Sequence, residues 1–385
     1  MHGKTKGHKP PTPNKTREKK KPNSTLRKII AFIVLIPTII VSILLVAATY
    51  IAYYPPVTYP LPALLGLAFP IFVVATLLLM LVLLWLYPKY ASVPFVAMLL
   101  SIPGLWLYSP INRGNNRLDT NRDSFSILSY NTFYFEDKEL RATGEKATYN
   151  RTLQNIINSN ADIVVLQEAN VRIKENTRHH FTHKQIEQIN KQYPYQINKN
   201  SGRVMSKYPL RFIDELEHSQ TAHTLICEAD IDGRKVTIFN NHLESIGLTK
   251  DDKQLYLDLT TQPDSINEKI GSVKIFTNKF LKAFSQRAKQ VAYIDSLART
   301  IDGNIIMCGD INDTPNSYAY HVFKDGRNEA YNQLCSGPGF TYCADRMWVR
   351  IDHVFYEGDM QAQYMHIDKV YSSDHFPLYV EFEWK

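Results

Sequence analysis

Two long apolar segments without a charged residue constrain the first third of this chain more than any other feature. They run from Ile29 to Tyr53 and from about Leu61 to Tyr87. Each is long enough to cross a hydrocarbon core about 30 Å thick, which takes a helix of about 20 residues. A third run, from Ala91 to Tyr108, is shorter and is interrupted by two prolines. The sequence therefore predicts two or three transmembrane helices within residues 29–108, at about 29–53, 61–87 and 91–108.

The segment before these runs, residues 1–28, is strongly basic. It holds ten Lys or Arg and one acidic residue, Glu18. The positive-inside rule retains such a tail in the cytoplasm. Three crossings would place the chain after Tyr108 outside the cytoplasm, and two would leave it inside. We expect an integral protein of an inner or plasma membrane with an extracytoplasmic C-terminal domain. Whether the tail is only solvated or also binds anionic lipid or nucleic acid stays open.

Residues 109–122 separate the apolar region from the rest of the chain. They are polar, rich in Asn and Arg, and without apolar periodicity, which is typical of a linker. Of the total charge of +7, residues 1–28 carry +9 and residues 29–110 carry +1, which leaves −3 for the remainder. A slightly acidic domain gives no support to a broad basic face for duplex DNA.

Beyond the linker, short apolar runs typical of buried strands end at or near polar residues. These residues are Asn131, Glu168, His242, Asp310, Asn312, Asp352, Asp374 and His375. A charged group in such a place needs a partner, a metal or an open cleft. Several strand ends that share one cleft would form an active site.

Strand and helix patterns alternate over the last 260 or so residues. Residues 125–131, 236–241 and 305–310 are typical of strands, and Phe280 to Ala298 is typical of a helix. The last residues, Leu378 to Trp384, alternate as in a half-exposed strand. This mixture predicts a layered α/β domain.

The order and spelling of six segments resemble the endonuclease/exonuclease/phosphatase superfamily, a magnesium-dependent group that includes DNase I-like nucleases, inositol polyphosphate phosphatases and neutral sphingomyelinases. The segments are SILSYN, DIVVLQE, IFNNHLES, IIMCGDIND, RIDHVFY and SSDH. One such segment occurs by chance in many proteins, but six in the right order are specific. The resemblance covers roughly residues 123–385. It implies a four-layer sandwich of two mixed β-sheets flanked by helices.

The resemblance also implies roles for the first group of polar residues. Glu168 matches the metal-binding Glu, and Asn131 matches an Asn that helps to hold the metal or the nucleophile. Asp310 matches an Asp that orients or deprotonates the attacking water, and Asn312 an Asn that holds a phosphate oxygen. Gly309 leaves room for a close backbone approach. The implied ion is Mg²⁺, with Mn²⁺ as the alternative.

A second group matches the superfamily's histidines. Asp374 and His375 belong to a segment that is similar to its C-terminal Ser-Asp-His signature. Asp352 is similar to the carboxylate that accepts a hydrogen bond from this His, which would favour the imidazolium. His242 matches a second His that donates to the phosphate or the leaving group.

The sequence thus predicts a membrane-anchored, metal-dependent phosphoesterase whose substrate is nucleic acid or a phospholipid head group. The competing hypothesis is a non-catalytic binding module on the same membrane stem. A transporter is disfavoured because the predicted spans carry no charge. No protein partner is indicated, and membrane lipid is the expected surrounding.

The chain contains four cysteines. Cys335 and Cys343 are near enough in sequence to form a bridge in an oxidising compartment. Cys227 and Cys308 lie in apolar strands and are expected to be buried thiols.

Overall fold

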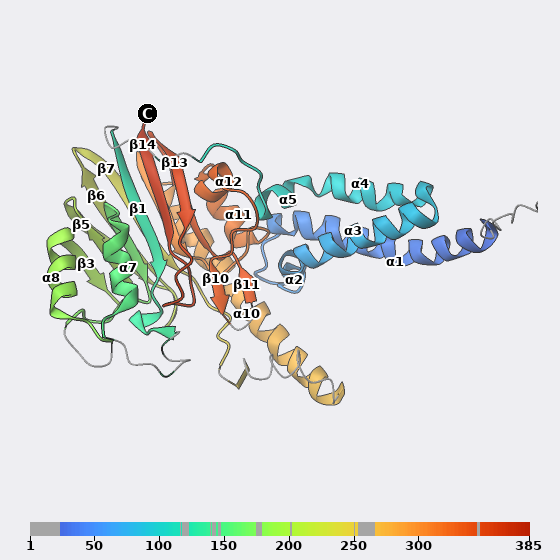
Figure 1. Cartoon of the computed structure of the whole chain (residues 1–385), viewed down its shortest axis with the longest axis horizontal. Helices are drawn as coiled ribbons and strands as arrows, with labels where there is room; N and C mark the ends of the chain where they lie inside the picture. Colours follow the sequence, from blue (N-terminus) through green and yellow to red (C-terminus); the bar gives the residue numbers. More distant parts are fainter. Residues whose placement is uncertain are drawn as a thin grey trace, which may run out of the picture.

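An α/β domain and an elongated group of apolar helices make up the chain, seen here in a computed structural model (Figure 1). The structure describes residues 24–115, 117, 123–138, 140, 144, 148–174, 179–200, 202–249, 251–252, 266–344 and 347–385. Most of the predicted basic tail and part of the predicted linker lie outside these residues.

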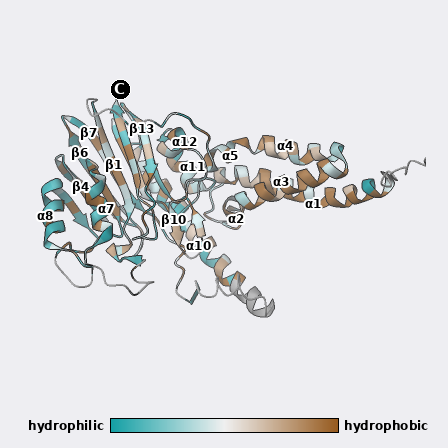
Figure 2. Ribbon diagram, in the orientation of Figure 1, coloured by the Kyte–Doolittle hydropathy of each residue, from teal (hydrophilic) through white to brown (hydrophobic). Residues whose placement is uncertain are grey.

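Apolar helices form the N-terminal part, and their ribbons are largely brown, the colour of hydrophobic residues, in Figure 2. They are α1 (Ser24–Tyr50), α2 (Ala63–Leu67), α3 (Phe69–Leu86), α4 (Ser92–Leu100) and α5 (Ile102–Tyr108), with 3₁₀ turns η1 (Ile51–Tyr53) and η2 (Pro88–Ala91). Two helical stretches, Thr25–Tyr53 and Phe69–Leu86, are long and apolar enough to cross a membrane. The pair Pro88–Leu100 and Ile102–Tyr108 bends by 56° and would be a third span if it crosses as one unit.

The second apolar run does not form one helix. Residues 61–68 make a turn and the short helix α2, and the long helix α3 begins only at Phe69. Pro70 in the first turn of α3 is compatible with this start, since the first amides of a helix need no intrahelical acceptor. Gly66 allows α2 to pack closely against the domain. A Cβ at this position would lie only 2.4 Å from the carbonyl oxygen of Asn316.

Two six-stranded mixed sheets form the domain. The strands of the first are β1 (Ser124–Asn131), β2 (Ile163–Gln167), β3 (Tyr195–Lys199), β4 (Gly202–Ser206), β13 (Met360–Ile367) and β14 (Leu378–Trp384), in the order β13-β14-β1-β2-β4-β3. Those of the second are β5 (Leu210–Glu217), β6 (His223–Ile231), β7 (Arg234–His242), β8 (Asn304–Asp310), β9 (Asn328–Glu329) and β12 (Asp352–Glu357), in the order β5-β6-β7-β8-β12-β9. A separate antiparallel pair consists of β10 (Tyr342–Ala344) and β11 (Met347–Val349).

Helices cover the outer faces of both sheets, so the domain has the predicted four layers. On the first sheet lie α7 (Arg151–Ser159) and α8 (His183–Gln192), and on the second α10 (Ile266–Ala298) and α11 (Tyr318–Lys324); the short α12 (Ala330–Leu334) contacts the core between the sheets. Along β1, Ile127 faces the core between the sheets, and Leu128 faces the layer of α7 and α8. This alternation follows from the two-residue period of a strand. The four-layer fold is therefore confirmed.

Two local predictions differ from the structure. The helix predicted from Phe280 begins at Ile266, so α10 is much longer than its apolar pattern indicated. Strand β14 is not half-exposed. Val380 packs between the sheets and Tyr379 packs in the layer of α7, so both faces of the strand are covered.

The domain rests directly on the ends of the apolar helices. Asn332 Nδ2 donates to the carbonyl oxygen of Trp106 at 2.9 Å, and Ser285 Oγ donates to that of Val57 at 2.9 Å. The side chain of Arg350 donates to the carbonyl oxygen of Leu107. These bonds join α5 and the loop before α2 to the domain.

The start of the predicted linker also lies against the domain. Asn112 Nδ2 donates to the carbonyl oxygens of Asn332 at 2.8 Å and Cys335 at 2.7 Å. Asn115 exchanges two hydrogen bonds with the backbone of Met365, at 2.8 and 2.9 Å. These residues hold the linker to the surface of the domain.

All four cysteines are free thiols. Cys227 and Cys308 are buried, as predicted, and both belong to the core between the sheets. Cys335 and Cys343 do not bridge.

Candidate functional site

Strand register brings the predicted polar residues to one edge of the two sheets. In the first sheet, β1 and β2 are parallel and end together, with Asn131 opposite Gln167 just before Glu168. In the second sheet, β7 and β8 are parallel and end with His242 opposite Asp310. Because the carboxyl ends of parallel strands meet at one edge, both pairs of ends face a common space.

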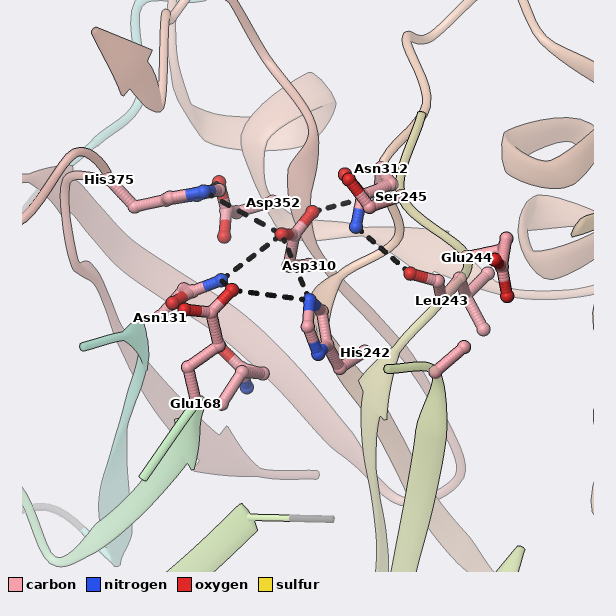
Figure 3. A network of polar contacts seen from close by, with 12 residues as sticks. Asn131, Glu168, His242, Leu243, Glu244, Ser245, Asp310, Asn312, Asp352 and His375 are labelled. Carbon is pink, nitrogen blue, oxygen red and sulfur yellow. Dashed lines mark hydrogen bonds and ion pairs between the residues drawn. The ribbon is translucent and has the colours of Figure 1, made fainter. Parts of the chain in front are cut away.

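Asp310 lies at the centre of this space (Figure 3). Asn131 Nδ2 donates to Asp310 Oδ2 at 3.2 Å and to Glu168 Oε1 at 3.3 Å. His242 Nε2 lies 3.6 Å from Glu168 Oε1 and 3.8 Å from Asp310 Oδ2. His375 Nε2 approaches the same Asp310 oxygen to 3.6 Å. Side chains from both sheets therefore meet at one carboxylate.

Asp352 and His375 form a buried pair beside Asp310. Asp352 begins β12 directly opposite Asp310 in the antiparallel register. His375 Nδ1 lies 2.8 Å from Asp352 Oδ2. Ser373 Oγ donates to the carbonyl oxygen of Asn131 at 2.8 Å, so the segment before β14 is tied to the end of β1. This bond fixes where the imidazole stands.

Asn312 and Asp374 complete the set on the cleft wall. The Asn312 amide donates to Asp310 Oδ1 at 2.8 Å, and its side-chain Nδ2 donates to the carbonyl oxygen of Leu243 at 3.0 Å. Asn312 and Glu168 both have positive φ, of 54° and 48°, which is uncommon for such residues. All eight polar residues predicted from the sequence thus come together.

Burial and neighbouring charge shift the pKa values of the two central carboxyl groups. Burial and the Asp374 carboxylate raise the pKa of Glu168 above its usual range. Burial, opposed by His375 and reinforced by Asp352, raises the pKa of Asp310 to about 7. A carboxyl group with a pKa near neutrality suits proton transfer.

The two histidines shift in opposite directions. Burial and the charge of His375 lower the pKa of His242 to about 4, so its imidazole is neutral at pH 7. Burial alone would lower the pKa of His375, but the carboxylates of Asp352 and Asp310 outweigh it and raise the pKa to about 10. His375 is therefore the positively charged member.

The donor set fits a divalent cation. Within the described part of the chain, the ion-pair partners of Glu168, Asp310 and Asp352 are His242 and His375, of which only His375 is charged. One ligand atom from each of Asp310, Asp352 and His375 lies within 4.8 Å of the others. Since His375 Nδ1 is already bound to Asp352, the carboxylate of Glu168, 20% exposed, is the better-placed oxygen ligand.

A cleft of about 350 Å³ opens above these residues. The floor of the cleft is polar. Part of its lining is apolar, and the sequence patterns did not predict this part. We call the group of Leu67, Ile246, Leu248, Phe280 and Phe284 the apolar side; Phe133, Met347, Val349 and Ile351 line the cleft as well. Apolar periodicity predicted the helix that carries the two phenylalanines, but nothing in the sequence indicated that it borders the site.

Comparison with known proteins agrees with this geometry. Residues 128–375 match the model of the Endonuclease/Exonuclease/phosphatase family. The chain belongs to this family. Residues 27–108, the apolar helices, match a domain of unknown function (DUF8431). No curated protein is similar enough to match the chain.

Several solved structures are similar at low sequence identity. Danio rerio TDP2, complexed with a single strand DNA product, is 16% identical with a TM-score of 0.43, over 69% of this chain and 100% of that one. An endonuclease/exonuclease/phosphatase from Beutenbergia cavernae is 16% identical with a TM-score of 0.45, over 68% and 72%. The human Nocturnin catalytic domain with bound sulfate is 16% identical with a TM-score of 0.42, over 69% and 96%.

Proposed function

We propose that this chain is a membrane-anchored enzyme that hydrolyses phosphodiester bonds with the help of a divalent cation. The observation that carries the proposal is the convergence of Asn131, Glu168, Asp310 and His375 on one cleft, with three carboxylates, Asp352 included, and a single charged imidazole. Hydrolysis of a phosphodiester needs this combination, because negative charge develops on the phosphoryl oxygens while a base directs water in line.

Glu168 is the proposed ligand of the cation. The Asn131 amide nitrogen orients this carboxylate, while its Oδ1 accepts a hydrogen bond from the amide of Phe133 at 3.2 Å. Bound Mg²⁺, or Mn²⁺ in its place, would neutralise charge on the phosphoryl oxygens. Asn131 would therefore help to hold the cation by orienting Glu168.

Asp310 and His375 are the proposed groups that act on the substrate. Asp310, with its pKa of about 7, accepts the proton of the attacking water. The water oxygen forms a bond to phosphorus, the bond to one ester oxygen breaks, and that oxygen leaves as an alcohol after it takes up a proton. The charged His375 stabilises the developing negative charge, and His242, Asn312 and Asp374 line the same space.

Full-length protein in lipid nanodiscs tests this proposal with bis(4-nitrophenyl) phosphate as a soluble diester. We expect hydrolysis with Mg²⁺ or Mn²⁺ and none with a chelator. Glu168→Gln and His375→Ala should each reduce kcat/KM by about a hundredfold or more. The matched control is Glu187→Gln, since Glu187 lies on the exposed face of α8 with 68% of its side chain accessible.

Two results would contradict the proposed enzymatic activity. Equal rates in all four proteins would assign the hydrolysis to a contaminant. No hydrolysis in any of them against diesters, monoesters and oligonucleotides would favour the alternative, a non-catalytic membrane-tethered binding module on the same fold.

The proposed location of the domain is outside the cytoplasm, in an inner or plasma membrane. This location requires three crossings, so the bent pair of α4 and α5 must cross as one span. The positive-inside rule supports it, because the ten basic residues of segment 1–28 favour the cytoplasmic side.

A further inference from the structure

The apolar side of the cleft lies at the membrane end of the domain. Leu67 ends α2, and the candidate span Phe69–Leu86 begins two residues later. Phe280 and Phe284 of α10 stand on the same side of the cleft, with ring centroids 6.0 Å apart. The cleft therefore continues from the polar site toward the place where the protein enters the bilayer.

The N-terminal half of α10 projects from the domain on the side of the apolar helices (Figure 1). Val273 and Ile275 on this half are 57% and 48% exposed, and Lys274 between them is exposed as well. Val273 precedes Phe280 by two helical turns, so an exposed apolar side chain lies on the same face of the helix as Phe280, which lines the cleft. The projecting half thus extends the apolar side of the cleft outward.

The cleft offers little to a nucleic acid backbone. Among the described residues that line it, the only Lys or Arg is Arg287. Its side chain is 1% exposed, and it binds Asp313 at 3.1 Å and the carbonyl oxygen of Glu244 at 2.8 Å. A polyanion with several phosphates would need more free cations than this.

We propose that the substrate is a membrane phospholipid that enters the cleft from the leaflet next to Leu67. Its phosphodiester group lies against Glu168 and His375, and its acyl chains lie along Leu67, Phe280 and Phe284. This inference rests on the proposed function. Water adds to phosphorus, one of the two ester P–O bonds breaks, and the products are a phosphomonoester and an alcohol, either of which carries the acyl chains.

The first experiment compares the same phosphodiesters with and without acyl chains. Full-length protein is placed in nanodiscs of phosphatidylethanolamine, phosphatidylglycerol and phosphatidylcholine with Mg²⁺, and its products are identified by mass spectrometry. Parallel reactions contain the deacylated glycerophosphodiesters or a single-stranded DNA oligonucleotide. We expect at least one phospholipid to be hydrolysed about tenfold faster, or more, than its deacylated form or the oligonucleotide.

Other outcomes separate the two proposals. If bis(4-nitrophenyl) phosphate or the oligonucleotide is hydrolysed and no phospholipid is preferred, the lipid inference fails while the phosphodiesterase remains. If no diester is hydrolysed, the phosphodiesterase itself fails, and the lipid inference fails with it.

Variants test the apolar side directly. Phe280→Ser and Leu248→Ser should each lower the ratio of phospholipid to soluble-diester hydrolysis by about tenfold or more, because a polar side chain replaces apolar contact with the acyl chains. Tyr293→Ser on the same helix is the control. Tyr293 is 53% exposed and does not line the cleft, so the ratio should stay unchanged. An unchanged ratio in both cleft variants would overturn the inference.

A second readout does not depend on turnover or on bound metal. Nanodiscs that contain phosphatidylcholine with a photoreactive acyl chain are irradiated in the presence of a chelator. We expect cross-links at Ile246 or Leu248, because this loop lines the cleft and is not part of the apolar helices. Cross-links confined to residues 24–108 would show that lipid surrounds the protein without entering the cleft, and would contradict the inference.

Discussion

The hydrogen bond of 2.8 Å between His375 Nδ1 and Asp352 Oδ2 determines the charge of the site. The folded-state pKa of His375, about 10, lies above the value of about 6.5 for an unfolded histidine. The pair therefore contributes stability that is complete below about pH 6.5 and is lost as the pH rises toward 10. The folded imidazole itself keeps its charge until the pH approaches 10.

Asp352→Asn should reveal both effects. Removing one partner of a buried pair should lower the free energy of unfolding by about 3 kcal/mol or more near pH 6. The loss should be smaller at alkaline pH, and the alkaline limit of kcat/KM should move to lower pH. Urea unfolding and pH–rate profiles measure these changes.

An exposed pair of the same type provides the control. His366 Nε2 lies 3.2 Å from Asp368 Oδ1, with side chains 33% and 47% exposed. Asp368→Asn should change stability by at most about 1 kcal/mol. Equal effects of the two substitutions would show that the buried pair has no special role.

Gly309, just before the central carboxylate, has φ of 124°, and a Cβ there would lie 2.1 Å from the carbonyl oxygen of Asn241. Gly309→Ala should therefore destabilise the protein by more than about 2 kcal/mol, since both strain and overlap arise. Gly303→Ala separates the two causes, because Gly303 has φ of 107° but no atom within 4 Å of the added Cβ. Similar unfolding midpoints for the two variants would show that the overlap with Asn241 does not contribute to the destabilisation.

Helix α2 is one of the elements that join the apolar helices to the domain, and Gly66 permits its contact with Asn316. Gly66→Leu should push α2 away from the domain, because its Cβ would lie 2.4 Å from the carbonyl oxygen of Asn316. We expect faster hydrogen exchange in residues 316–321 and a lower thermal unfolding midpoint. Gly114→Leu is the control, since no atom lies within 4 Å of its added Cβ. Unchanged exchange around Asn316 would contradict a tight junction.

Sequence patterns predicted those helices and strands whose apolar residues recur with the period of the element. The strands that end at Asn131, His242 and Asp310 have uninterrupted apolar runs, and the family motifs added their order. The start of α10 was missed. Apolar residues recur at helical spacing from Ile266 to Phe280, but Gly271 and Asn278 within this stretch have low helix propensity. Leu67 was assigned to a membrane span because its neighbours are all apolar. Its place beside the cleft depends on tertiary contacts that no local pattern encodes.

The whole molecule has its two chain ends on opposite sides of the membrane if three crossings occur. Alkaline phosphatase fused after Lys385 should then be active, since this reporter folds only after export. A fusion after Tyr87, behind the second candidate span, should be inactive. Inactivity of both fusions would favour two crossings and return cytoplasmic substrates to consideration.

Hydrogen bonds from Asn332 and Ser285 fix the domain to the ends of the apolar helices, and this attachment affects kinetics. A catalyst on a long tether explores the surrounding volume, whereas the proposed enzyme would be held at a set height and orientation above the lipid surface. Its encounters then follow lateral diffusion, so the turnover of a bilayer component should depend on its mole fraction in the leaflet and not on its bulk concentration.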